Sequence, residues 1–367
     1  MSGQNFNEIY NSYEKIKETI TPQDFLHRIN FYTENISDVK KVTYKFYDCL
    51  ISIVVPFIEK HFETAVNLLK SLPNNISEKY EVIMINNSGS YKDVESFKNA
   101  GAPTDNLTVL NNDGKNLLPF NSRRLGSINA KGKWIWYVDA DDKVSKVPNS
   151  IINVLFNDNS DIIRFSERLI QNDKLFNLPG FEFSVFDDSI KNKELTVQSA
   201  NYCLHPIIIN KDFYMSHIYE GIKDVDVNFF YGEDTLLLRY IVTKYRTIKD
   251  VDGTLYSYDF DKGESHSVIR TADSIKTIIN DFPTISKIYS QVFTKEQLAK
   301  FEMDNYSYKN VILFYIDDLV YHLEKENNPN YNSMEVKSSL TKELMRVILL
   351  NNMNDALDER SHIHNSQ

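Results

Sequence analysis

Three carboxylates lie within four residues, in the segment Asp139-Ala140-Asp141-Asp142, directly after an apolar run. Carboxylate oxygens are the hard ligands that Mg²⁺ and Mn²⁺ prefer, and these ions commonly use one or two carboxylates together with substrate phosphates. A divalent ion held there would neutralise the charge of a diphosphate. The alternative is a solvated turn that caps a helix, because a short acidic motif by itself has a high false-positive rate.

The elements that would position these carboxylates are short apolar runs separated by stretches of helical character, such as residues 63–72. Strands that are almost continuously apolar and alternate with helices predict an α/β fold with a mostly parallel sheet buried on both faces. Ligands bind beyond the carboxyl ends of such strands, so the residues just after each run are the candidate site. The four clearest runs are Leu50–Val55, Glu81–Ile85, Leu107–Leu110 and Trp134–Val138.

The helical period of three and four residues dominates at both ends of the chain. It recurs from Phe6 to Ile20 and again from Ile275 to Val292. The sequence therefore predicts three parts: an N-terminal helical extension over 1–48, an α/β domain over 49–270 and a C-terminal helical region over 271–367. The helical ends could serve homo-oligomerisation or recognition of an acceptor.

Composition narrows the functional classes. The 367 residues include 51 Asp and Glu against 41 Lys and Arg, a formal charge of -10 that argues against nucleic acid as a partner. The two cysteines, Cys49 and Cys203, are far apart and outside any metal-ligand spacing. The first residues lack a signal-peptide pattern, and no apolar stretch is long enough to span a membrane. We therefore predict a cytoplasmic protein, with peripheral attachment to the inner face of the membrane left open.

Four segments, in this order and spacing, resemble a bacterial family 2 glycosyltransferase with the GT-A fold. They are ISIVVP (51–56), EVIMINNSGS (81–90), the segment 122–142 that ends in the three carboxylates, and YGED (231–234). The resemblance spans roughly residues 50–270 and leaves the helical ends unexplained. It implies a GT-A-type sheet flanked by helices and an enzyme that moves a sugar from a nucleotide-sugar, a UDP-sugar, to an acceptor hydroxyl with inversion, in bacterial glycan or glycoconjugate assembly. The acceptor would be a carbohydrate or a lipid-linked or protein-linked group.

The resemblance also assigns roles by position. Pro56 and Phe57 would border the nucleoside, Arg123 would lie near the diphosphate, and Asp141 would ligate Mn²⁺ or Mg²⁺. Asp139 would face the ribose or the metal. The residues implied to bind the nucleotide-sugar are Pro56, Phe57, Glu59, Asn86, Arg123, Asp139 and Ala140.

The turn after the second run departs from the family pattern, which usually has Asp-Asp where this chain has Asn86-Asn87. An Asp carboxylate there accepts the N3–H of uracil, and an Asn oxygen can also accept it, with less strength because no charge assists. Alternatively, the two asparagines only build a tight turn, because Asn tolerates the left-handed backbone conformation. The sequence leaves both interpretations open.

Inverting transfer needs a base on the acceptor side, and a carboxylate at a helix start is held firmly there and kept ionised by the helix N-terminus. Asp234 is the candidate base, and Glu233 would hold position or bind acceptor hydroxyls. Farther on, His266 lies where some family members carry a histidine that joins the metal, which would favour Mn²⁺ because of its nitrogen ligand. A polar surface histidine is the alternative.

Two other functional classes remain as alternatives. A sugar nucleotidyltransferase shares a related core, but it would need a glycine-rich loop after the first run, and residues 57–62 contain no glycine. A non-catalytic nucleotide-sugar-binding scaffold subunit would keep the fold without turnover, and the intact Asp141 and Asp234 argue against it.

Overall fold

The computed structural model describes residues 49–75, 80–112, 117–171, 174–177, 204–229, 232–259, 271–302, 312–313, 316–317, 319–320 and 332–364. Contacts divide the chain into two compact units, Met1–Phe46 and Tyr47–Gln367, and every described residue belongs to the second. The helices predicted over 1–48 therefore lie outside the described residues, as does His266.

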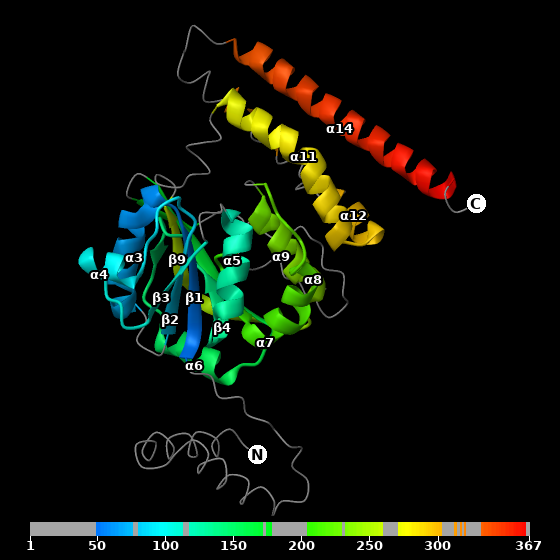
Figure 1. Cartoon of the computed structure of the whole chain (residues 1–367). Helices are drawn as coiled ribbons and strands as arrows, with labels where there is room; N and C mark the ends of the chain where they lie inside the picture. Colours follow the sequence, from blue (N-terminus) through cyan, green and yellow to red (C-terminus); the bar gives the residue numbers. More distant parts are fainter. Residues whose placement is uncertain are drawn as a thin grey trace, which may run out of the picture. The chain divides into compact units, whose positions relative to one another are not determined.

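The described part of the second unit is built on a nine-stranded sheet in the order β3-β2-β1-β4-β8-β6-β9-β5, with β7 beside β6 (Figure 1). β1 pairs in parallel with β2 and β4, β2 with β3, and β6 with β9, whereas β8 runs antiparallel to both β4 and β6. The strands are β1 (Cys49–Phe57), β2 (Tyr80–Asn86), β3 (Leu107–Asn111), β4 (Gly132–Tyr137), β5 (Lys143–Val144), β6 (Ile162–Gln171), β7 (Lys174–Asn177), β8 (Ile207–Asn210) and β9 (Ile248–Asp259). This is a mostly parallel, GT-A-like α/β sheet, and the predicted fold class is confirmed.

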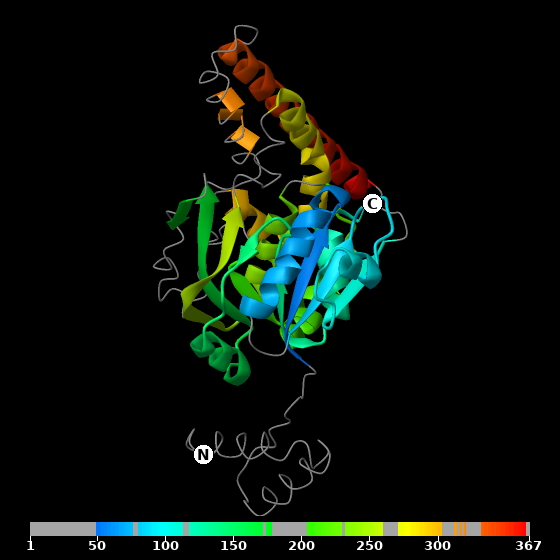
Figure 2. The same ribbon diagram turned by 90° about the vertical axis from the view of Figure 1, so that its left-hand side faces the viewer.

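Helices cover both faces of the sheet, as the continuous apolar runs predict. Alternate residues of β1 enter different cores: Ile53 and Val55 pack with α3 and α6, and Val54 packs with α5 and α9. Figures 1 and 2 show α3 and α5 on opposite faces. The helices of these layers are α3 (Phe62–Asn75), α4 (Val94–Asn99), α5 (Leu118–Asn129), α6 (Asn149–Asn157) and α9 (Glu233–Lys244).

Short helical turns join these layers. They are η1 (Glu59–His61), α7 (Lys211–Phe213), the π-helical turn η5 (Tyr214–Tyr219) and α8 (Glu220–Ile222). Arg124 of α5 holds the end of α8, because its Nη1 donates to the carbonyls of Ile222 and Val225 at 2.7 Å each. The segment that leads toward α9 is therefore anchored on α5.

The C-terminal helices are α11 (Ala272–Val292), α12 (Lys295–Glu302) and α14 (Ser333–His364). The C-terminal half of α11 shares a core with α9 through Ile285 and Tyr289. Its N-terminal half packs against α14 through Ile275 and Ile279. The apolar core of the sheet domain thus continues into α11. No helix in the described ranges has the length and apolar character needed to cross a membrane.

Candidate active site

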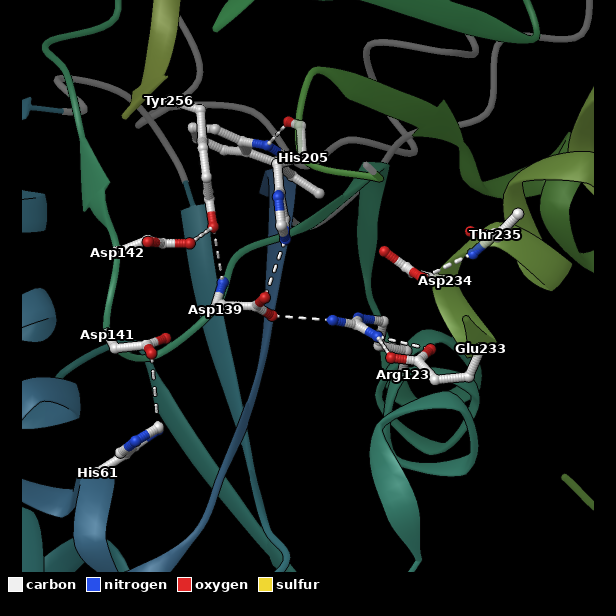
Figure 3. A network of polar contacts seen from close by, with 11 residues as sticks. His61, Arg123, Asp139, Asp141, Asp142, His205, Glu233, Asp234, Thr235 and Tyr256 are labelled. Atoms are coloured by element: carbon white, nitrogen blue, oxygen red, sulfur yellow. Dashed lines mark hydrogen bonds and ion pairs between the residues drawn. The ribbon is translucent and has the colours of Figure 1, made fainter. Parts of the chain in front are cut away.

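Polar side chains from six parts of the chain meet at the edge of the sheet where β4 ends (Figure 3). Asp139, Asp141 and Asp142 follow β4, and Glu233 and Asp234 begin α9. His205 precedes β8, and it reaches the same edge because β8 runs antiparallel to β4. The remaining members come from α5, β9 and the end of η1: Arg123, Tyr256 and His61.

Arg123 links the two acidic segments. Its Nη1 donates to both oxygens of Glu233 at 2.7 and 2.9 Å, and its Nη2 donates to Asp139 Oδ1 at 2.9 Å. Burial raises the pKa of Glu233 to about 7, and the Arg123 charge opposes that rise. Burial also acts to raise the pKa of Asp139, but the charges of Arg123 and His205 outweigh it and hold that pKa below its usual range. Arg123 is thus used to fix two carboxylates, and contact with a diphosphate stays a prediction.

A second cluster joins Asp139 and Asp142 to His205. The ligand atoms of these three residues lie within 4.8 Å of one another. His205 Nε2 is 3.0 Å from Asp139 Oδ2, and the imidazole stacks on the Tyr256 ring with 4.3 Å between centroids. The Tyr256 hydroxyl donates to Asp142. Burial raises the pKa of Asp142, and the negative charges of Asp139 and Asp141 raise it further although His205 opposes them.

The donor set of this cluster suits a divalent ion. Two carboxylates and one imidazole are ligands that Mn²⁺ accepts, and Mg²⁺ accepts the carboxylates more readily than the imidazole. Asp142 is disfavoured as an anion by burial and by neighbouring carboxylates, so a cation among these oxygens would relieve the repulsion. The residues present therefore fit the metal that the family resemblance implies.

Asp234 points toward Asp139 and His205 from the start of α9 (Figure 3). Its Oδ1 accepts the backbone N–H of Thr235 at 2.8 Å, which fixes the carboxylate on the first turn. The preceding Gly232 has φ 82°, in the left-handed region that an L residue enters at a cost. Burial raises the pKa of Asp234. The two residues of the acidic pair therefore have different surroundings: Glu233 binds Arg123, and Asp234 faces Asp139 and His205.

Asn86, which the resemblance predicts to lie against the base, has both polar atoms of its side-chain amide hydrogen-bonded within the protein. Its Nδ2 donates to Ser90 O and to Asn111 Oδ1 at 2.7 Å each, and its Oδ1 accepts the N–H of Ser88 at 3.0 Å and the Ser88 hydroxyl. Asn87 acts similarly, accepting the N–H of Leu117 at 2.7 Å. The bonding supports the turn-building interpretation of this pair.

We expect Asn86→Asp to destabilise the fold. The carboxylate would face two acceptors, Ser90 O and Asn111 Oδ1, in place of the two N–H bonds that the amide donates. Losing buried hydrogen bonds and leaving acceptors unpaired costs about 1–3 kcal/mol each, so the free energy of unfolding in urea should fall by at least that amount. If Asn86→Asp left stability unchanged and tightened binding of UDP, Asn86 would be a base-reading residue.

The other predicted nucleoside contacts have distinct environments. The Phe57 ring is 2% exposed and packs edge-on against Phe97 with 5.5 Å between centroids, so the ring is not free to stack on a base. Pro56 is half-buried. Glu59 is exposed; it accepts from the Ser90 hydroxyl and lies 3.0 Å from Lys92 Nζ. Their roles at the nucleotide stay predictions.

The remaining predicted metal residues are placed differently. Asp141 Oδ2 lies 4.0 Å from His61 Nδ1, beside the cluster of Asp139, Asp142 and His205 but not among its closest ligand atoms. Ala140 is buried between these carboxylates along the chain. Sequence reasoning assigned no role to His205 or His61. The apolar run Ile207–Ile209 after His205 is visible in the sequence, but its antiparallel direction is not.

Residues 52–212 match the sequence model of Glycosyl transferase family 2. Among solved structures, Staphylococcus aureus TarS 1–349 is similar with 15% identity and a TM-score of 0.42, covering 80% of this chain and 91% of that chain. The same fragment in complex with UDP-GlcNAc gives 16% identity and a TM-score of 0.44 with the same coverage. No curated protein matches the chain. Residues 52–212 are thus identified by their sequence as similar to glycosyl transferase family 2.

Proposed function

We propose that this domain transfers a sugar from a nucleotide-sugar donor to an acceptor hydroxyl with inversion, and that the donor is a UDP-sugar. One observation carries the proposal: Arg123 ties Glu233, beside the candidate base, to Asp139, the first carboxylate after β4. The start of α9, which carries the candidate base, and the acidic segment after β4, which would lie near the diphosphate, are thus joined in one network through Arg123. The uracil base rests on the family resemblance alone.

In this mechanism Asp234 takes the proton from the acceptor hydroxyl. A general base works best with a pKa near the working pH, and burial shifts the pKa of Asp234 upward. Glu233 and Arg123 hold the start of α9 in register with Asp139, so the base keeps its position relative to the donor side. Attack from the face opposite the departing diphosphate would invert the anomeric carbon.

Asp139, Asp142 and His205 would hold the divalent ion, Mn²⁺ or Mg²⁺. When bound, the ion supplies positive charge that stabilises the diphosphate leaving group. The stacked Tyr256 ring fixes the plane of the imidazole, and its hydroxyl orients Asp142. Partners of this kind set ligand geometry in metal sites.

The experiment that tests the function is a panel of nucleotide-sugars screened by thermal shift and by donor hydrolysis, with and without Mn²⁺. A donor that binds the folded state raises its apparent stability, and slow hydrolysis shows that transfer to water occurs. Binding without any hydrolysis or transfer would favour the scaffold subunit. Release of pyrophosphate from a nucleoside triphosphate and a sugar phosphate would favour the nucleotidyltransferase.

His205→Ala should weaken Mn²⁺ binding by at least about tenfold, the smallest loss typical even of residues that only orient a metal ligand. Mg²⁺ binding should fall less, because nitrogen ligation favours Mn²⁺. Calorimetry of each ion against the protein alone measures both effects. The matched control is His217→Ala, since His217 is exposed on η5 and outside the cluster. An equal response of the two variants would remove His205 from the metal site.

A further inference from the structure

α14 has a second apolar stripe besides the one that packs on α11. Leu340, Leu344 and Val347 are buried against α11, at 1%, 0% and 7% exposure. Met334, Met345 and Leu349 are 67%, 45% and 58% exposed. The residues of this second stripe recur at helical spacing and share one face. They are Met334, Ser338, Thr341, Met345 and Leu349, called here the outer stripe.

The outer stripe carries three exposed apolar residues, with Ser338 and Thr341 between Met334 and Met345. Of the seven exposed large hydrophobic residues in the described ranges, four lie on α14, so the exposure is concentrated on this helix. Single exposed apolar residues are ordinary, but a contiguous row commonly marks an interaction site. A shallow groove follows the row, lined by Ser338, Thr341, Lys342, Met345, Arg346 and Leu349.

The outer stripe of one α14 helix can pack against the outer stripe of a second α14 helix that runs in the opposite direction. If two α14 helices run antiparallel with their centre between Thr341 and Lys342, Met334 of one lies opposite Leu349 of the other. Ser338 then lies opposite Met345, so a small side chain meets a large one on either side of the centre, where Thr341 lies opposite Lys342. This alternation of small and large residues is what close packing of two helices needs.

The charges beside the stripe match the same arrangement. Glu335 and Arg346 lie on the same flank of α14, because they are eleven residues apart, or about three helical turns. Antiparallel pairing brings the same flank of both helices together, so Glu335 of one copy meets Arg346 of the other. Within one helix these residues are separated by about 16 Å along the axis and cannot pair. Inside its own helix, Arg346 pairs with Glu343 at 2.6 Å.

We propose that the outer stripe of α14 is the contact between two copies of this chain, with their α14 helices antiparallel about a twofold axis near Thr341 and Lys342. Such a contact has one surface patch on both partners, as a closed twofold dimer requires. A single helix pair of this length buries less than the roughly 800 Å² per partner of a standard interface. The two copies of Lys342 also repel near the axis. We therefore expect a dimer that dissociates in the micromolar range.

The test is sedimentation equilibrium of the full chain over a concentration series. Leu349→Glu should weaken the dimer by at least about tenfold, because both copies lose a contact and gain a charge in the interface. The matched control is Leu350→Glu: Leu350 is the next residue, 46% exposed, and lies on a different face of α14. Circular dichroism of both variants checks that the helices remain. Equal weakening by both, or a wild-type chain that stays monomeric up to about millimolar concentration, would overturn the proposal.

Charge reversal tests the register. Glu335→Arg and Arg346→Glu should each weaken the dimer, since each sets like charges against each other across the axis. The double variant should recover most of the loss, and only an intermolecular pair can give this rescue. Weakening by both single variants without rescue, or a trimer in the wild type, would contradict the antiparallel arrangement.

Discussion

Asp234→Asn should lower turnover by about 10² to 10⁴-fold while donor affinity stays similar. Asparagine keeps nearly the same shape and can still accept the Thr235 N–H that fixes the carboxylate on α9. It cannot take the proton of the acceptor hydroxyl. Single-turnover transfer rates at saturating donor, together with calorimetric donor affinity, separate the chemical step from binding.

The matched control for this variant is Asp226→Asn, the same change at an exposed residue on the segment that leads to α9. Its turnover should equal that of the wild type. Glu233→Gln serves as the comparison within the acidic pair: it removes the charge opposite Arg123, so its main effect should be on stability. If Asp234→Asn turned over normally and Glu233→Gln did not, the base would be Glu233.

The first four strands could be predicted from the sequence to within about two residues at each end, because a parallel strand buried on both faces is apolar along its whole length. Trp134 and Trp136 illustrate this: both are 0% exposed, and their indole N–H groups are satisfied by the carbonyls of Leu155 and His205. Apolar periodicity carries no information on strand direction. For that reason the run Ile207–Ile209 did not reveal that His205 would lie beside Asp139.

The candidate site, too, could be predicted only in part from the sequence. Asp139 and Glu233 are recognisable by residue type and position, and Arg123 joins them in the structure. What residue type cannot show is whether a side chain is already used within the protein. Asn86 matches the family position against the base, yet all of its amide bonds go to Ser88, Ser90 and Asn111. Such saturation depends on loop geometry that the spacing of motifs does not contain.

Arg123→Met should destabilise the domain by about 3–5 kcal/mol, the usual loss when one partner of a buried ion pair is removed. Methionine has a similar length, so the packing of α5 is largely kept while Glu233, which is 6% exposed, loses its positive partner. Asp139 contributes less, because its side chain is 31% exposed and solvent screens the lost interaction. The midpoint and slope of urea unfolding measure the loss.

The dependence of this loss on pH identifies its cause. Burial raises the pKa of Glu233 from 4.5 to about 7, so the folded state holds that proton more tightly than the unfolded state, and the stability that Glu233 contributes falls as pH rises through this window. Without Arg123 the pKa of Glu233 rises further, and the fall continues to higher pH. The deficit of Arg123→Met should therefore be larger at about pH 8 than at about pH 5.5.

The neighbouring arginine provides the control for this pH dependence. Arg124 donates to the backbone carbonyls of Ile222 and Val225, which do not titrate. Arg124→Met should therefore destabilise the domain by a similar amount at both pH values. A deficit of Arg123→Met that is equally flat with pH would mean that the guanidinium serves only to pack α5 against α9. The ion pairs of Arg123 with Glu233 and Asp139 would then contribute nothing as charge interactions.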